Sequence, residues 1–139
     1  MDYRLLTTKK LTSLIKKNPD IVNEIEYKKT QTIGEYLYEI MQIKKVKVAD
    51  LIPKTNLSKQ YIYQIFNNER SPGKNTVMKL SFALRLSLDE VQRALALADN
   101  GALYPKVRRD AALMACLVKN YTVEETENFL LSIGEEPLL

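Results

Sequence analysis

Residues 46–66 read VKVADLIPKTNLSKQYIYQIF, and this stretch decides the fold that we expect for the whole chain. Its pattern of apolar residues predicts two short helices that meet at residues 55–57. Ser58 is a good N-cap for the second helix, because its hydroxyl can accept a hydrogen bond from an amide two or three residues further along. The second helix then has a narrow apolar seam, by which it would pack on a core, formed by Leu57, Ile62 and Ile65.

The other face of the second helix carries long side chains that form hydrogen bonds. Residues at i, i+3, i+4 and i+7 share one face of a helix, and here these are Gln60, Tyr63, Gln64 and Asn67. Glutamine can bind adenine in bidentate fashion and lysine can reach guanine acceptors, so Gln60, Gln64 and the neighbouring Lys59 suit the major groove of DNA. An ordinary solvated helix face explains these residues about equally well, because Lys and Gln are common on wet surfaces.

Two residues of the first helix and the junction bear on how the two helices cross. Pro53 lacks the amide hydrogen for an i to i−4 bond and clashes with the preceding turn, so we expect a kink or an early end there. Asn56 stands where a left-handed backbone conformation would be useful, and asparagine tolerates it better than most residues. The two helices can then cross sharply.

The composition restricts the kinds of site that the chain can hold. With 139 residues it is long enough for one domain, or a domain with an extension, around a real core. It has one cysteine, Cys116, and no histidine, so we expect a reducing compartment, a core thiol and no zinc or other metal site. Only four glycines are present and none forms a phosphate-binding loop. We therefore expect no cofactor.

The distribution of apolar residues bears on the cellular location. No apolar run approaches the roughly 18 to 20 residues that span a bilayer. The N-terminal residues lack the apolar core of a signal peptide. We therefore expect a cytoplasmic protein that does not bind a membrane.

Positive charge is concentrated around the opening stretch. In residues 44–85 nine basic residues face two acidic ones, which gives this segment a charge of +7. From residue 86 onward five basic residues face nine acidic ones, which gives −4. A polyanionic partner explains this arrangement most simply, because each phosphate that is neutralised releases counterions. The alternative is a solvated basic surface without a partner.

Capping signals and helical spacing divide the chain into three parts. Residues 1–31 form a helical arm, whose second helix would begin at Asn18-Pro19. Residues 32–100 form the main domain, and residues 101–139 form a helical extension. Helix starts are predicted by Asn75 as an N-cap and by capping boxes at residues 32–35, 87–90 and 122–125. Since no stretch alternates apolar and polar residues between turn pairs, we expect an all-α fold.

The order of these parts resembles the Cro/lambda-repressor-type (XRE-family) helix-turn-helix domain of bacterial and phage transcription regulators. The resemblance covers about residues 32–91. KTNLS at residues 54–58 is similar to the family's Lys-Thr-Gly-Ile-Ser, and YIYQI at residues 61–65 to its Tyr-Ile-x-Gln-Ile. TVMKL at residues 76–80 and SLDE at residues 87–90 follow in the family's order. This implies a five-helix, lambda-repressor-like DNA-binding domain with flanking helical extensions.

The resemblance also implies which residues would meet DNA. Ser58 would open the recognition helix, which runs to Phe66 and lies in the major groove. Val48 stands where the family often has a glutamine that meets a phosphate, so that contact would be either lost or supplied by Lys47. The base-reading positions would be Lys59, Gln60, Tyr63 and Gln64. The positions on the DNA backbone, where contacts place the protein without reading sequence, would be Lys47, Ser58, Asn67, Arg70, Ser71 and Lys74.

The leading hypothesis is a sequence-specific transcription regulator, working as a repressor on double-stranded DNA. The apolar faces of residues 101–139 could complete the monomer core or pair two chains. We expect a homodimer through this section, because two recognition helices one DNA turn apart, roughly 34 to 36 Å, combine their weak affinities. The alternative is an antitoxin or helical adaptor, for which residues 101–139 would bind an unknown protein partner. An enzyme is not expected. Acidic pairs such as Glu124-Glu125 lie in a capped first turn, where they serve the helix dipole.

Overall fold

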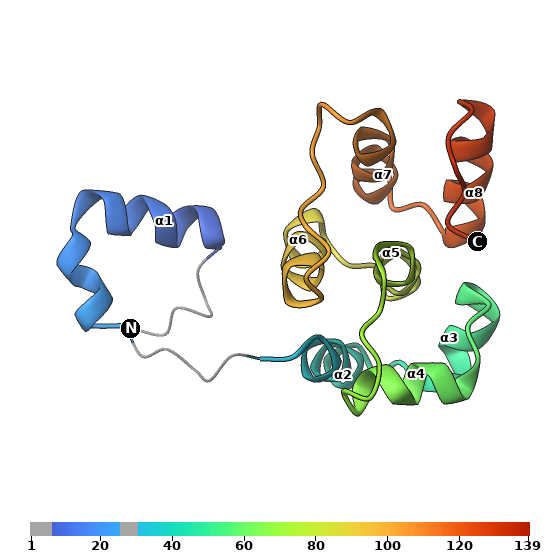
Figure 1. The fold of residues 1–139 in the computed structure, drawn as a ribbon, viewed down its shortest axis with the longest axis horizontal. Helices are drawn as coiled ribbons and strands as arrows, with labels where there is room; N and C mark the ends of the chain where they lie inside the picture. The colour runs from blue at the N-terminus through green and yellow to red at the C-terminus, as the bar shows by residue number, and fades with distance from the viewer. Residues whose placement is uncertain (1–6, 26–30) are drawn as a thin grey trace. The chain divides into compact units, whose positions relative to one another are not determined.

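The structure is a computed structural model that describes residues 7–25 and 31–139. The chain divides into two compact units, residues 1–31 and residues 32–139 (Figure 1). Residues 1–6 and 26–30 of the expected N-terminal arm lie outside the described residues.

The first unit contains helix α1 (Thr8–Lys17) and the short 3-10 helix η2 (Pro19–Asn23). Helix α1 begins where the Thr7 hydroxyl accepts a hydrogen bond from the Lys10 amide at 3.1 Å. The helix predicted after Asn18 is present only as this five-residue 3-10 turn, and the Asn18 side chain forms no capping hydrogen bond. Ile25 is buried in this unit.

The second unit consists of seven helices and their connections. These are α2 (Ile33–Lys44), α3 (Val48–Thr55), α4 (Lys59–Phe66), α5 (Lys74–Ala83), α6 (Leu88–Leu97), α7 (Arg108–Val118) and α8 (Val123–Ser132). Every regular element in the described residues is a helix, so the predicted all-α fold is confirmed. Helices α2 to α6 are the five that the family resemblance implied.

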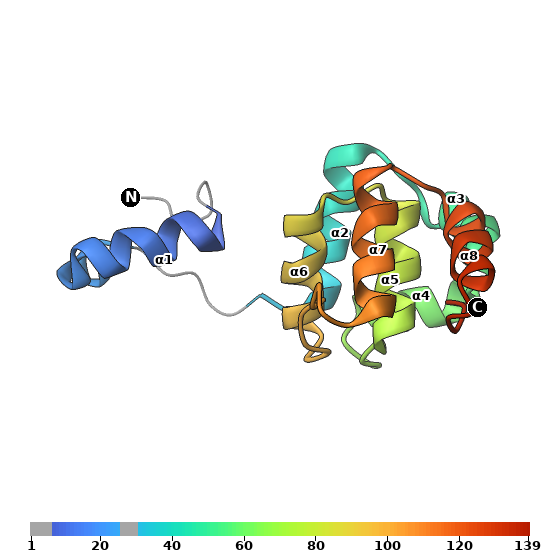
Figure 2. The same ribbon diagram turned by 90° about the horizontal axis from the view of Figure 1, so that it is seen from above.

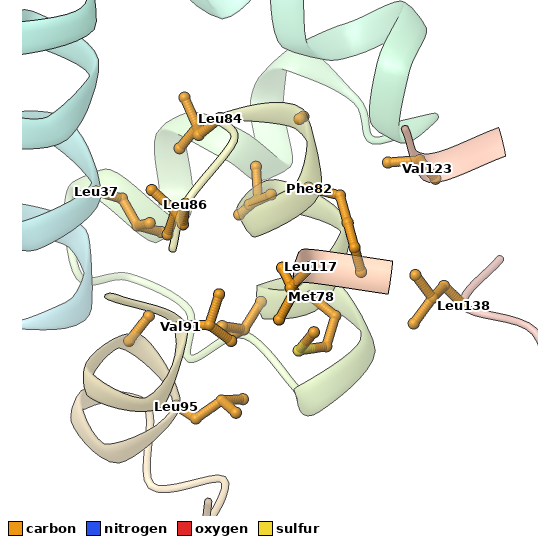
Figure 3. Packing of buried hydrophobic residues seen from close by; sticks show 14 of the residues in the cluster. Leu37, Met78, Phe82, Leu84, Leu86, Val91, Leu95, Leu117, Val123 and Leu138 are labelled. Atoms are coloured by element: carbon orange, nitrogen blue, oxygen red, sulfur yellow. The ribbon is translucent and has the colours of Figure 1, made fainter. Parts of the chain in front are cut away.

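Helix α5 lies at the centre of the second unit (Figure 1). It packs against α3, α6 and α8, while α7 lies between α6 and α8 (Figure 2). A single apolar cluster runs through all seven helices and includes Leu37, Val91, Leu117 and Leu138 (Figure 3). Full burial of one such side chain contributes about 1.5 to 3 kcal/mol. Helices α7 and α8 therefore share the core of the helices before them.

Local capping fixes where several of these helices begin. The predicted capping boxes of α6 and α8 are confirmed, since the Ser87 and Thr122 hydroxyls accept from the amides of Glu90 and Glu125. The two carboxylates accept in return from the Ser87 and Thr122 amides, at 2.8 and 3.0 Å. The prediction for α5 is wrong, because that helix begins at Lys74 with Gly73 as its N-cap. Asn75 instead accepts a hydrogen bond from another helix, as described below.

Of the two outcomes predicted at Pro53, a kink or an early end of the helix, the early end is not found, because α3 continues to Thr55. The last turn is closed by two hydrogen bonds that do not need the missing proline amide. The Thr55 hydroxyl donates to the Leu51 carbonyl at 2.7 Å, and the Asn56 amide donates to the Ile52 carbonyl at 2.9 Å. The carbonyl that cannot receive a hydrogen bond from Pro53 belongs to Ala49, an exposed residue of the helix, where water can bind it.

Candidate nucleic-acid interface

Helix α4 is held by one face and exposes the other. Its N-cap is Ser58, whose hydroxyl accepts from the Tyr61 amide at 3.1 Å, as the sequence predicted. Ile62 and Ile65 are fully buried and Leu57 is partly buried, so the predicted apolar seam is confirmed. The side chains on the opposite side of α4 therefore face outward.

The turn between α3 and α4 sets the direction in which α4 leaves the core. Asn56 has φ 58° and ψ 24°, which is the left-handed conformation that the sequence predicted. The preceding Thr55 is completely buried, and its hydroxyl oxygen accepts from the Leu57 amide at 3.3 Å. The turn is thus fixed by backbone conformation and by a buried side chain on its inner side.

Gly34 in α2 determines how closely α4 approaches α2. This role was not predicted from the sequence. Gly34 is buried, and a Cβ atom there would clash with the Ile65 carbonyl oxygen. The same Cβ would lie 2.7 Å from the Phe66 carbonyl oxygen and 3.0 Å from Asn68 Oδ1. The available signal was a glycine inside a helical pattern, which costs about 1 kcal/mol relative to alanine and so indicates a packing requirement.

The outward side of α4 carries the four residues predicted to read bases. We call this surface the reading face and define it as Lys59, Gln60, Tyr63 and Gln64. The first three are exposed and Gln64 is partly buried. Lys59 Nζ lies 5.9 Å from the centre of the Tyr63 ring, within the range of a cation–π contact.

Gln60 and Gln64 both line the surface hollows on the reading face. Each of them borders two open hollows, with volumes of about 380 and 530 Å³. The first hollow is also lined by Asn56, Leu57, Ser58, Tyr61 and Arg70, and the second by Lys59, Tyr63, Asn67 and Glu69. The two amide side chains therefore stand between concave surfaces, with donors and acceptors free to meet a polar partner.

Three of the six residues predicted to meet the DNA backbone, Ser58, Asn67 and Arg70, line the hollows beside the reading face. Arg70 is exposed and its guanidinium carbon is 5.5 Å from the centre of the Tyr61 ring. Asn67 is the exposed C-cap of α4, and Ser71 is exposed in the following loop. Lys47 is exposed at the start of α3, where its amide donates to Asp50 Oδ2 at 3.0 Å. The hydroxyl of Ser58 serves the helix cap described above.

Lys74 differs from these residues because it already has an anionic partner. Its Nζ lies 2.7 Å from Asp110 Oδ1 of helix α7, and its side chain is 31% exposed. The structure therefore brings the reading face, Asn67 and Arg70 together, while it directs Lys74 toward α7. The sequence could not show that Lys74 pairs with Asp110, because the two residues lie 36 positions apart in the chain.

The perturbed pKa values belong to residues outside the reading face, and burial is their main cause. Burial, and next the nearby Glu90 carboxylate, raise the pKa of Tyr36 in α2 to about 12. Burial lowers the pKa of Lys79 in α5, although Glu127 opposes this shift. Burial also raises the pKa of the Cys116 thiol, which is 1% exposed and is the core thiol that the sequence predicted.

The described residues offer neither a metal-binding cluster nor a membrane span. No three His, Cys, Asp or Glu side chains among them are grouped so that they could hold a metal ion. None of the described helices is both long enough and apolar enough to cross a bilayer.

Comparison with protein families identifies the reading unit. A family model described as helix-turn-helix matches residues 37–91, which run from α2 to α6. Residues 37–91 therefore match the XRE-type helix-turn-helix family model. The predicted resemblance is thereby confirmed, and the helix-turn-helix family is a DNA-binding family. Comparisons of the chain with curated proteins and with solved structures gave no match.

Proposed function

We propose that this protein is a cytoplasmic, sequence-specific transcription regulator that places α4, from Ser58 to Phe66, in the major groove of double-stranded DNA. The observation that carries the proposal is the outward placement of Gln60 and Gln64 on α4. They lie on a helix that is anchored by the completely buried Ile62 and Ile65, within a segment of charge +7. A helix held this rigidly can present its polar edge to base pairs without ordering new backbone.

The reading face has the chemistry that base edges require. Gln60 and Gln64 can each bond the N6 and N7 groups of an adenine, Lys59 can donate to guanine acceptors, and the Tyr63 ring can contact a thymine methyl. Each good bidentate pair discriminates against the wrong base by about 1 to 3 kcal/mol. Two neighbouring glutamines would therefore give a preference at two positions of the site.

The residues around the reading face would hold the protein on the DNA backbone. Arg70 and Lys47 supply positive charge, and Asn67, Ser71 and the Ser58 N-cap supply hydrogen-bond donors. Such contacts fix the register of the protein without reading sequence. By covering its site, the bound protein would exclude other proteins from the same DNA, which is the action of a repressor.

Selection of binding sites from random duplex DNA tests this proposal. The wild-type protein should enrich a defined sequence, and Gln60→Ala and Gln64→Ala should each relax the preference at one position. Gln42→Ala is the matched control, because Gln42 is an exposed glutamine on α2 outside both hollows. Identical selected profiles for all three variants and the wild type would refute the assignment of α4 as the reading helix.

A homodimer completes the proposal, and the exposed apolar side chains of the last two helices support it. Val118 at the end of α7 is 76% exposed and Leu131 in α8 is 61% exposed. Two copies joined through residues 101–139 would carry two recognition helices to half-sites on one DNA. Sedimentation equilibrium should show a dimer that Val118→Asp or Leu131→Asp dissociates.

The same exposed side chains favour a second candidate, an antitoxin or helical adaptor that binds another protein through residues 101–139. The two candidates differ at the reading face. An adaptor has no need of Gln60 and Gln64, so substitution there would leave its activity intact. The random-site selection separates them, because an adaptor would enrich no defined sequence.

A further inference from the structure

Residues that follow the matched domain contact the end of the connection between α4 and α5 and the first turn of α5. The Asn100 side-chain amide donates to the Pro72 carbonyl at 2.9 Å. Arg109 Nη2 donates to Asn75 Oδ1, also at 2.9 Å. Lys74, which lies between Pro72 and Asn75 in the sequence, forms an ion pair with Asp110, and its Nζ is 2.7 Å from Asp110 Oδ1. Residues 72–75 are therefore joined by three contacts to residues 100–110.

Asp110 is a buried carboxylate with few ways to balance its charge. It is 4% exposed. One oxygen accepts from the Tyr104 amide at 3.0 Å, and the other faces Lys74. A carboxylate removed from water in this way is costly unless a cation accompanies it. Lys74 is that cation.

A DNA phosphate would have to compete with Asp110 for Lys74. The competing contact would lie at the exposed surface, where ion pairs are screened by salt and contribute little. Transfer of Lys74 to a phosphate would also leave the buried Asp110 charge without its partner. The cost of leaving Asp110 unpaired exceeds the gain from a screened phosphate contact, so Lys74 should remain with Asp110 when DNA binds.

We propose that Asp110 withholds Lys74 from DNA, so that a residue outside the helix-turn-helix domain sets how many phosphates the protein neutralises. This inference rests on the proposed function. Because phosphate contacts add affinity for every sequence alike, withholding one lowers the sequence-independent part of binding. Base contacts by the reading face are left unchanged.

The salt dependence of DNA binding tests the inference. For the selected site, log K should fall with log salt more steeply in Asp110→Asn than in the wild type, by about 0.9 for one added phosphate contact. The matched control is Asp99→Asn, which removes the same charge from an exposed residue. Asp99 has φ 56°, a conformation that asparagine tolerates. Equal slopes for the two variants would overturn the inference.

Two further variants keep the test decisive if Asp110→Asn is poorly folded, which circular dichroism would show. Lys74→Ala should lower the melting temperature but leave the salt slope at the wild-type value. A slope shallower by about 0.9 in Lys74→Ala would instead place Lys74 on DNA in the wild type and overturn the inference. The double variant Asp110→Asn/Lys74→Ala should return to the wild-type slope, and a slope that stays steep would likewise overturn it.

The outcome for the wild type separates this inference from the function on which it rests. If the wild-type protein selects no sequence and binds no duplex, the proposed function fails and the inference with it. If the wild type binds its selected site but Asp110→Asn matches Asp99→Asn, only the inference fails.

Discussion

The backbone of Gly34 in α2 lies directly against the carbonyl oxygen of Ile65, in the last turn of α4, with no space for a Cβ atom. The two residues are 31 positions apart in the sequence. Their contact fixes the distance between the first helix of the domain and the C-terminal end of the reading helix. The position of the reading face therefore depends on a residue that carries no side chain.

Gly34→Ala should destabilise the protein and weaken its base discrimination. Alanine gains about 1 kcal/mol of helix propensity, but the added methyl meets two backbone carbonyls, and overpacking of this kind costs about 1 to 3 kcal/mol or more. Urea denaturation should show a net loss of stability. Gly34→Ala should lose more stability than Gly73→Ala, where nothing lies within 4 Å of a Cβ and only the N-cap preference of α5 is affected. An unchanged or higher stability of Gly34→Ala would show that α4 can move away without cost.

The left-handed turn before α4 gives a second prediction. Asn56→Ala should lower the free energy of unfolding by about 1 to 2 kcal/mol, because alanine is strained at φ 58°. Asn56→Gly should be close to neutral, since glycine adopts this conformation freely. Asn128→Ala, on the exposed side of α8, is the control and should have little effect. Equal losses for alanine and glycine at residue 56 would point to the asparagine side chain instead of the backbone.

Lys44 supports α5 from another helix. Its Nζ donates to the Leu84 and Arg85 carbonyls at 2.8 and 2.9 Å, where α5 ends. A cation at a helix C-terminus also interacts favourably with the helix dipole. Lys44→Met should therefore cost about 1 kcal/mol in chemical denaturation, whereas Lys54→Met, at an exposed position of α3, should cost less. Equal costs would show that the two hydrogen bonds contribute nothing.

The raised pKa of Tyr36 predicts a loss of stability in alkali. Its hydroxyl donates to the Glu90 carbonyl at 3.4 Å, and burial, followed by the Glu90 charge, raises its pKa from 10.0 to about 12. Because the folded state favours the neutral phenol, this stabilisation is complete below pH 10 and is lost as the pH rises through 12. Tyr36→Phe should remove this part of the pH dependence. Tyr104→Phe, at a site 62% exposed, should not.

Much of the fold follows from local sequence. Hydroxyl caps at Ser58, Ser87 and Thr122 and the left-handed Asn56 lie where the sequence predicted. These features depend on residues a few positions apart, whose interactions are the same in any surroundings. The apolar seam of α4 was equally predictable, because helical periodicity alone determines which side chains share a face.

The end of the chain shows what such reasoning misses. The sequence predicted only that residues 134–139 belong to the extension formed by residues 101–139. In the structure Leu138 is buried, and the amides of Leu138 and Leu139 donate to the two carboxylate oxygens of Glu127 in α8. The residues of the tail itself do not distinguish a buried tail from a solvated tail, because the burial of Leu138 depends on Glu127, eleven residues earlier in the chain.

The sequence by itself determined that the protein is all-α, where most of its helices begin, and that about residues 32–91 resemble a helix-turn-helix domain, which the family model matches over residues 37–91. Only the tertiary structure decided that Gly34 supports the reading helix and that Lys74 faces Asp110. The reason is physical. Caps and periodic faces arise from neighbours in the chain, whereas a close backbone approach and the choice of an ionic partner depend on which helices the packed core brings together.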